Sequence, residues 1–168
     1  MREAFVARPG CVLVSADYSQ IEMRLMAHFS RDAPLIAALQ AGQDIFTARA
    51  ARLFGVAAPA EVKDAQRAQA KAVSYAILYG AGPGLLVQNL AISIDDARRL
   101  IAAWHRAYPR VQELIEERLH AARLVGFVET LGGRKRFLPH IKASGRAERA
   151  RAERQVVNTL AVLTMAIL

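Results

Sequence analysis

The sequence predicts an α+β fold that is predominantly helical. Most of the 168 residues fall in segments of good helix formers whose apolar positions repeat every three or four residues. Two stretches look like strands: the β-branched run "CVLVSAD", which begins at Cys11, and the segment around Gly132-Gly133. A chain of this length with 54% hydrophobic residues has enough apolar surface for the core of one globular domain.

The first element expected is a buried strand from Cys11 to about Ala16. Pro9 and Gly10 introduce it, and a polar residue closes it. Asp17 then lies where the strand ends and a helix begins, at the rim of a sheet, where ligands and metal ions reach a carboxylate. Aspartate is also common in turns, so Asp17 alone does not decide between a functional and a structural role.

A helix is expected after this strand, because Ile21, Leu25 and Phe29 are four residues apart. Ser19 and Glu22 have the spacing of a capping box at its start. Further along the chain, the pattern predicts a turn over 80–84, a hairpin or extended loop within 126–139, and helices over Ile45–Phe54, Gln66–Tyr79, Ser93–Ala107, Arg110–Leu124 and from about Ala147.

The helix expected over 66–79 places two cations and two aromatic side chains in one stripe. Arg67, Lys71, Tyr75 and Tyr79 recur every four residues and span roughly 18 Å of helix axis, which is comparable to a nucleoside triphosphate. The cations lie towards the helix N-terminus, which favours anions, and the aromatics lie where a base and sugar would pack. An amphipathic helix with exposed cations and buried tyrosines has the same spacing, so both interpretations stay open.

The chain is basic, with a net charge of +8 and a sequence pI near 10.4, which favours a polyanionic partner such as nucleic acid or a membrane surface. Eight cations and two acidic residues lie between Arg134 and Arg154, so this segment carries +6 of the total. A solvated helix face also carries such charge. A single cysteine excludes a disulfide within the chain and a cysteine-cluster metal site. No apolar run reaches the ~20 residues of a membrane span.

Three motifs, in this order, resemble those of family A DNA polymerases. The string "DYSQIEMR" resembles their motif A, "RAQAKAVSYAILYG" resembles their motif B helix, and "VETLGGRKRFLP" resembles the segment that follows the fingers. The resemblance extends to about Asn158. It implies a fingers subdomain with a partial palm: partial palm over 1–40, fingers over 41–130, and a hairpin and helix that return to the palm over 131–168, where the chain is expected to be truncated.

The resemblance implies template-directed DNA synthesis, in which a nucleotidyl group passes from a deoxynucleoside triphosphate to the primer 3′-hydroxyl by a two-metal mechanism. Asp17 and the backbone carbonyl of Tyr18 would hold Mg²⁺. Arg67 and Lys71 would bind the triphosphate and stabilise the negative charge of the transition state. Asp17, Arg67 and Lys71 are therefore the implied catalytic residues.

The resemblance also implies a substrate pocket around the sugar and base. Glu22 would close the space beside the sugar C2′ and so exclude ribonucleotides, and Tyr79 would stack at the nascent base pair. Tyr75, where the family has Phe or Tyr, would face the sugar. Gln20 completes the implied substrate-binding residues.

The implied contacts with primer-template DNA come from Arg134, Arg136, Arg154 and Asn158. The cations between them would face phosphates and read no base sequence. The implied partners are primer-template DNA and deoxynucleoside triphosphates. The protein is expected to be a monomer in the cytoplasm, associated with the nucleoid and not with a membrane.

Two departures from the family pattern affect these expectations. Phe46 stands where the family places a His that helps to bind the triphosphate, so one donor is missing. After Asn158 the chain reads "TLAVLTMAIL", without the Gln that the family places there, and Asp17 is the one carboxylate in a strand-end setting. The chain is therefore expected to be incomplete and inactive alone. The alternatives are a non-catalytic nucleic-acid or nucleotide-binding remnant and a plain helical interaction domain.

Overall fold

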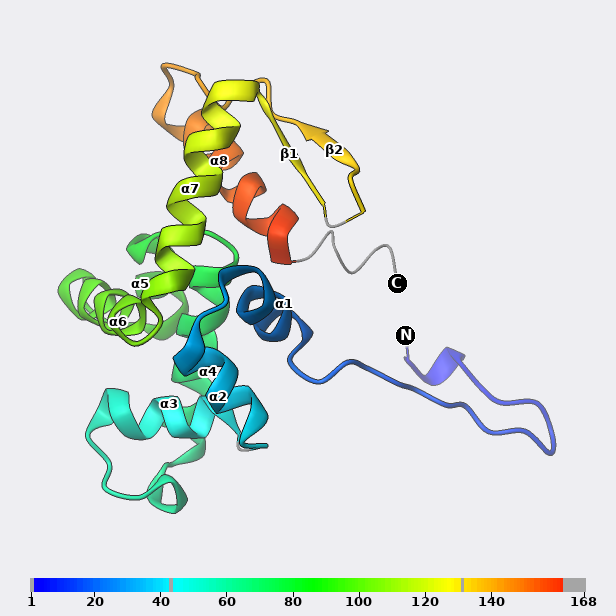
Figure 1. Ribbon diagram of the computed structural model, residues 1–168. Helices are drawn as coiled ribbons and strands as arrows, with labels where there is room; N and C mark the ends of the chain where they lie inside the picture. Colours follow the sequence, from blue (N-terminus) through cyan, green and yellow to red (C-terminus); the bar gives the residue numbers. More distant parts are fainter. Residues whose placement is uncertain (1, 43, 131, 162–168) are drawn as a thin grey trace.

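The computed structural model describes residues 2–42, 44–130 and 132–161, and it confirms the predominantly helical α+β fold. Figure 1 shows helices through most of this part of the chain and one small antiparallel sheet. The helices are α1 (Ile21–Ser30), α2 (Ala33–Gln40), α3 (Ile45–Phe54), α4 (Asp64–Leu78), α5 (Pro83–Leu90), α6 (Ile94–Ala107), α7 (Pro109–Val125) and α8 (Arg146–Ala161). The strands are β1 (Phe127–Glu129) and β2 (Lys135–Phe137), and single 3₁₀ turns occupy Arg2–Ala4 and Pro59–Glu61.

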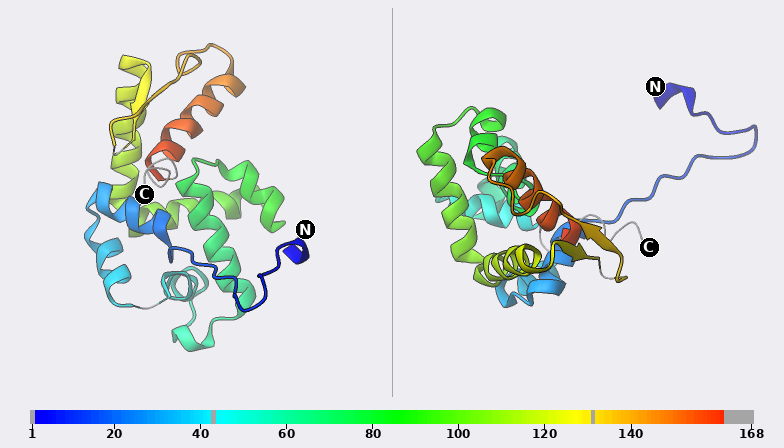
Figure 2. Two further views of the ribbon diagram at one scale, coloured as in Figure 1. Left: turned by 90° about the vertical axis from the view of Figure 1, so that its right-hand side faces the viewer. Right: turned by 90° about the horizontal axis from the view of Figure 1, so that it is seen from above.

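The buried strand predicted from Cys11 to Ala16 is wrong. The segment pairs with no strand in the described part of the chain, and it extends away from the helical body in Figures 1 and 2. Val12, Leu13 and Val14 are 81%, 64% and 85% exposed, and the Cys11 thiol is exposed as well. A β-branched run becomes a stable strand only beside a neighbour that satisfies its backbone hydrogen bonds, and the described residues supply none.

The predicted helices are confirmed to within about two residues at each end. α3 has the predicted bounds, and Ser93 caps α6 by accepting a hydrogen bond from the Asp96 N–H. Two short helices, α2 and α5, lie outside the prediction. Each has a proline in its first turn, and in α5 Pro83 follows Gly82, which also suits a turn. The turn predicted over 80–84 is correspondingly shorter. The divergent tail is described only as far as residue 161, so its remainder, 162–168, lies outside the described residues.

The main hydrophobic core lies between α1, α4, α6 and the first half of α7. Trp104 is fully buried in it, and its indole N–H donates to Ser74 Oγ at 3.1 Å. The Ser74 hydroxyl in turn donates to the Ala70 carbonyl at 2.8 Å. Met23 of α1 and Leu78 of α4 are buried in the same cluster. One side of α4 is therefore fixed by the core, while its other side presents polar side chains.

A second, smaller core joins α7 to the sheet and to α8. Val128 of β1 and Leu138 after β2 are buried against Ala152 and Val156 of α8. The two strands are antiparallel, with Val128 opposite Arg136. In Figure 1 this unit projects beyond the end of the main helical body.

Gly80, at the end of α4, lies where the main helical body meets α8. Its φ is +67°, and a Cβ on it would lie 3.2 Å from both the Arg154 Cα and the Val157 Cγ2. Glycine therefore permits both the turn after α4 and the close approach of α8. The contact places the end of α4 against the middle of α8.

Candidate functional site

Three residues of the predicted stripe lie on one face of α4, the fourth, Tyr79, caps its C-terminus, and Phe46 of α3 lies beside them. The rings of Tyr75 and Tyr79 are stacked, with centroids 5.9 Å apart and an interplanar angle of 26°. The Phe46 ring lies 5.8 Å from that of Tyr75. Lys71 Nζ is 5.8 Å from the Tyr75 centroid, and the Arg67 guanidinium carbon is 6.0 Å from the Phe46 centroid. We call Arg67, Lys71, Tyr75 and Tyr79 the α4 face.

Asp44, at the start of α3, holds Arg67 in place. Its carboxylate accepts hydrogen bonds from Arg67 Nε, from Thr47 Oγ1 at 2.5 Å and from the Phe46 N–H at 3.2 Å. Burial alone would raise the pKa of Asp44, but the hydrogen bonds from Arg67 and Thr47 outweigh it and lower the pKa. The same contact raises the pKa of Arg67. In the described part of the chain, the two terminal nitrogens of Arg67 have no hydrogen-bond partner.

Sequence reasoning missed Asp44 as a site residue. An aspartate before a helix, with Thr47 three residues later, is a recognisable N-cap signal. The pairing of Asp44 with Arg67 spans 23 residues and leaves no local signal. Phe46, in the position of the missing donor, is buried and supports the aromatic and cationic side chains of the α4 face.

Glu22 contacts Tyr79 and does not cap α1. The Tyr79 hydroxyl donates to Glu22 Oε1 at 3.2 Å, across 57 residues of sequence. The capping box predicted from Ser19 and Glu22 is wrong, because the residue before the helix is Gln20, which is left-handed at φ 53° and makes no side-chain cap. Burial and then the Glu22 charge raise the pKa values of Tyr79 and Tyr75. Glu22 thus lies against the aromatic end of the α4 face.

Asp17 and Tyr18 are exposed, just before α1. Burial and then Glu22 and Tyr79 raise the pKa of Tyr75, and the charge of Asp17 adds the smallest effect in the same direction. Among the residues the structure describes, no group of three or more His, Cys, Asp or Glu side chains is arranged to hold a metal ion. Because Mg²⁺ requires several oxygen ligands in octahedral geometry, Asp17 and the Tyr18 carbonyl do not make a complete site by themselves.

Arg154 and Asn158 lie one turn apart on α8, where α8 passes Gly80. Arg154 is exposed and Asn158 is half-buried. The side-chain oxygen of Asn158 is buried and has no hydrogen-bond partner within 2–42, 44–130 and 132–161. One cation and one unpaired amide oxygen therefore lie beside the end of α4.

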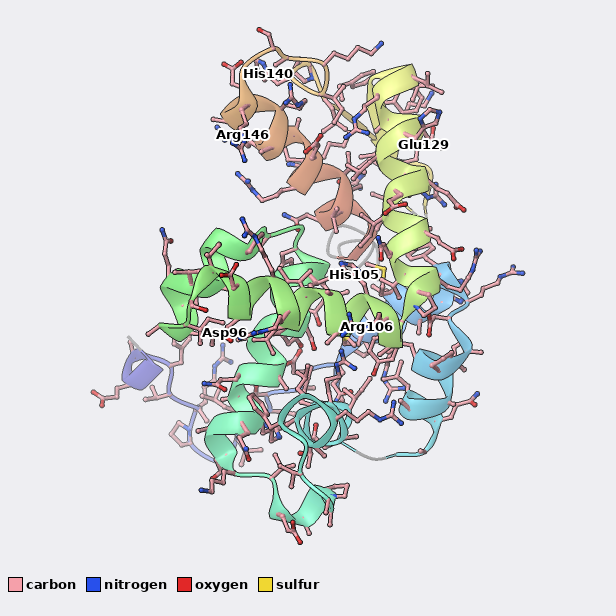
Figure 3. The ribbon with its side chains drawn as sticks, turned by 90° about the vertical axis from the view of Figure 1, so that its left-hand side faces the viewer. Asp96, His105, Arg106, Glu129, His140 and Arg146 are labelled. Carbon is pink, nitrogen blue, oxygen red and sulfur yellow. The ribbon has the colours of Figure 1, made fainter. Side chains whose placement is uncertain are left out.

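The cations from Arg134 to Arg154, which we call the basic segment, extend over the hairpin, the following loop and α8. The Arg134 N–H donates to Thr130 Oγ1 at 3.2 Å in the turn between the strands, and Arg136 is half-buried on β2. Figure 3 shows Arg146 at the start of α8, beyond the helical body. Arg134 and Arg136 therefore lie on the hairpin, and Arg154 lies on α8.

Within the part of the chain that the structure describes, most cations of the basic segment have no acidic partner. Glu153 accepts a hydrogen bond at 2.7 Å from Arg123, which lies outside the segment, and Lys135 lies 3.8 Å from Glu129. Within the described residues, the following cations form no ion pair: Arg134, Arg136, Lys142, Arg146, Arg149, Arg151 and Arg154. Their charge is available to a polyanion.

Comparisons with known proteins identify the family. The model of DNA polymerase family A matches residues 1–162, so the chain belongs to this family. It is 47% identical over 158 residues to DNA polymerase I of Chloroflexus aurantiacus and 42% identical over 159 residues to the thermostable DNA polymerase I of Thermus aquaticus. These matches cover 94% of this chain but 17% and 19% of the two relatives. The chain therefore spans only a small part of the relatives' length.

The fold is also similar to that of a solved polymerase structure. The POL domain of Pol1 from M. smegmatis, in complex with DNA primer-template and dNTP, matches with a TM-score of 0.82 and 38% identity. The match covers 89% of this chain and 26% of that one. Polymerases of this family use divalent metal ions. No helix in the part of the chain that the structure describes is long and apolar enough to cross a membrane.

Proposed function

We propose that this chain supplies the nucleotide-binding face and part of the DNA-binding surface of a template-directed DNA polymerase. The observation that carries this proposal is the arrangement of the α4 face, with two cations at one end and two stacked tyrosines at the other. Arg67 and Tyr79 are separated by roughly 18 Å of helix axis, which suits a triphosphate with its sugar and base. In this assignment residues 1–40 belong to the palm, 41–130 to the fingers and 131–168 to the segment that returns to the palm.

The cationic end binds the triphosphate. Lys71 Nζ and the terminal nitrogens of Arg67 donate charge-assisted hydrogen bonds, which strengthen as negative charge collects on the leaving pyrophosphate. Asp44 occupies Arg67 Nε and so fixes the direction of the guanidinium group before a nucleotide arrives. A group that is oriented in advance loses less conformational freedom on binding.

The aromatic end binds the sugar and base. Tyr79 stacks at the nascent base pair, and its hydrogen bond fixes Glu22 beside the sugar, where the carboxylate leaves no room for a 2′-hydroxyl. Tyr75 faces the sugar with its hydroxyl, between Lys71 and Tyr79. Gln20 precedes α1 in the same region and completes the substrate pocket.

The metal and DNA contacts complete the proposal. Asp17 and the Tyr18 carbonyl contribute oxygen ligands to Mg²⁺, which activates the primer 3′-hydroxyl when it is bound, together with ligands that the described residues do not supply. Arg134, Arg136, Arg154 and Asn158 bind the sugar-phosphate backbone of primer-template DNA, which positions the duplex without reading its sequence. We further propose that the protein acts as a monomer in the cytoplasm, at the nucleoid.

A domain exchange tests the proposed function. Residues 17–158 would replace the matching segment of the Thermus aquaticus relative, and primer extension would be measured with Mg²⁺ and all four deoxynucleoside triphosphates. The exchanged enzyme is expected to extend the primer, and Lys71→Ala within it to abolish most of that activity. A correctly folded exchange protein that binds primer-template DNA without extending it would instead support the non-catalytic remnant.

A further inference from the structure

The described structure contains a buried arginine without a partner. Arg49 of α3 is 5% exposed, and its Nε and Nη2 atoms are buried with no hydrogen-bond partner in the described part of the chain. Burial lowers the pKa of Arg49, and the charges of Arg52 and Arg106 lower it further. A buried cation is stable only when it is paired with an opposite charge or forms hydrogen bonds, so an anion bound at this position would stabilise Arg49.

The Arg49 guanidinium group lies over an aromatic ring. Its guanidinium carbon lies 5.5 Å from the ring centroid of Tyr108, which is itself 5% exposed. A cation over a ring keeps its edges free for hydrogen bonds in the guanidinium plane. Nε and Nη2 form one such edge, and two parallel N–H groups on one edge match the oxygens of a carboxylate or a phosphate.

The acidic residue near this arginine already has other partners. Asp32 is fully buried and close enough to raise the pKa of Tyr108, after the larger effect of burial. Its two oxygens accept hydrogen bonds from the Leu35 N–H at 2.9 Å and the Arg110 N–H at 3.1 Å. Asp32 therefore holds the starts of α2 and α7 and forms no ion pair with Arg49 among the described residues.

A cavity adjoins Arg49 and contains a second cation. It has a volume of about 290 Å³ and lies between α2, α3 and the start of α7. Its lining includes Arg49, Arg52, Tyr108 and the small side chains of Ala37 and Ala48. A water molecule occupies about 30 Å³ of liquid, so the cavity has room for a small oxyanion with some of its hydration shell.

A third cation lies on the neighbouring side of Arg52. A wider cavity of about 600 Å³ is lined by Arg52 and by Arg106 of α6, which Figure 3 shows on the helical body. Arg52 lines both cavities. Neither Arg52 nor Arg106 forms an ion pair within the residues that the structure describes. Asp96 lines the same cavity but is paired with Arg99, so among the described residues Arg49, Arg52 and Arg106 form no ion pair.

We propose that Arg49, Arg52 and Tyr108 form a binding site for a small oxyanion, a phosphate or a carboxylate group. Nε and Nη2 of Arg49 are shielded from water as the side chain stands, so binding requires its terminal torsions to turn these two atoms towards the cavity that Arg49 lines. There they bind the oxyanion side by side, and Arg52 and Tyr108 are the other polar side chains of the cavity lining. This cavity shares no lining residue with the α4 face, so the site is an addition to the proposed nucleotide contacts.

Inorganic phosphate and acetate are the probes for this site. The unaltered 168-residue chain would be titrated with each at constant ionic strength, with chloride as the reference. Thermal unfolding would give the midpoint temperature of the unfolding transition, and ¹⁵N-resolved NMR would follow the Nε–H signal of Arg49. We expect phosphate, acetate or both to raise the midpoint and to move that signal, and the more effective probe identifies the source of the oxyanion. Absence of both responses with both probes overturns the proposal.

Variants localise the response. Arg49→Met removes the charge at similar volume and should abolish the rise in midpoint, and Arg52→Gln, at an exposed position where the fold is not at risk, should weaken binding about tenfold. Arg98→Gln, a matched exposed arginine on α6, should leave binding unchanged. A response of Arg52→Gln equal to that of the unaltered chain contradicts the proposal, even if Arg49→Met fails to fold. Lys71→Ala changes the proposed nucleotide site and should still show the phosphate-induced shift of the Arg49 Nε–H signal, so a failure of that site is distinguishable from a failure of this one.

Discussion

The α4 face and the basic segment are both cationic, but they differ in how their cations are held. On the α4 face, Arg67 is hydrogen bonded to Asp44, and Lys71 lies over the rings of Phe46 and Tyr75. In the basic segment, most cations are exposed, and within the described residues Lys135 is the one that forms an ion pair. The first arrangement fixes a few charges at defined positions, while the second distributes many charges over a surface.

Under the proposed function, this difference corresponds to two kinds of anion. A single triphosphate needs donors at fixed distances, because its transition-state charge develops on particular atoms. A nucleic-acid backbone repeats its phosphates, so exposed and adaptable cations bind it at many registers without reading sequence. The proposed function would thus use anchored cations where geometry matters and free cations where total charge matters.

The largest effect is expected from Lys71→Ala. The variant should bind nucleoside triphosphate more weakly by about 1–3 kcal/mol, because a charge-assisted hydrogen bond is removed from a defined position. Calorimetric titration of the chain measures this, with circular dichroism to verify the fold. Lys142→Ala removes an equal charge from an exposed position of the basic segment and should change the affinity much less. Equal losses of affinity in the two variants would remove the distinction between anchored and free cations.

Tyr75→Phe should change the choice between deoxy and dideoxy nucleotides. The Tyr75 hydroxyl can make the hydrogen bond that a sugar without a 3′-hydroxyl lacks, so the tyrosine form should accept dideoxynucleotides nearly as readily as normal ones. With the segment placed in an intact family member, Tyr75→Phe is expected to lower the dideoxy-to-deoxy incorporation ratio about tenfold, the effect of one hydrogen bond. Incorporation ratios that stay the same would show that the hydroxyl does not face the sugar.

Asp44→Asn should affect stability in a pH-dependent way. The folded pKa of Asp44 is lowered, so its contribution is complete above the unfolded pKa of about 3.9 and is lost as the pH falls through the folded value, which lies below it. Because Arg67 and Asp44 are 43% and 31% exposed, solvent screening limits the loss of stability in the variant at pH 7 to about 1 kcal/mol or less. Asparagine retains the N-cap, so the substitution isolates the charge.

Urea unfolding at pH 7 and pH 3 measures this contribution. The unaltered chain should lose more stability between the two pH values than Asp44→Asn does. Asp95→Asn, in an exposed ion pair with Arg98, is the matched control and should behave like the unaltered chain. The assignment fails if Asp44→Asn and the unaltered chain lose the same amount of stability on acidification.

The smallest effect is expected in the basic segment. Arg154→Gln should reduce the affinity for primer-template DNA only slightly at physiological salt. The slope of the logarithm of the binding constant against the logarithm of the salt concentration should also become shallower by about 0.9, because the protein no longer neutralises one DNA phosphate. Fluorescence anisotropy across a salt series measures the slope. Arg98→Gln, on α6 and paired with Asp95, should leave the slope unchanged. A steep loss of affinity in Arg154→Gln with no change of slope would indicate an anchored cation and not a distributed one.

Local patterns predicted the helices and the stripe on α4, because both depend on helical spacing within one segment. They did not predict the contacts that shape the site: Asp44 with Arg67 and Glu22 with Tyr79 join segments 23 and 57 residues apart. The strand expected from Cys11 failed for the same reason. A strand is stable only beside a partner strand. The β-branched run shows that its residues favour a strand, but not that a partner is present.

The close contact at Gly80 constrains any movement of α4 relative to α8. Because the turn after α4 touches the backbone of α8, any rotation of α4 about this point displaces its two ends by very different amounts. Arg67 lies thirteen residues from Gly80, roughly 20 Å along the helix axis, so a rotation of about 20° carries it by about 7 Å. Tyr79, adjacent to Gly80, hardly shifts. A rotation of α4 about Gly80 would therefore carry the two cations across the site, while the tyrosine end kept its position.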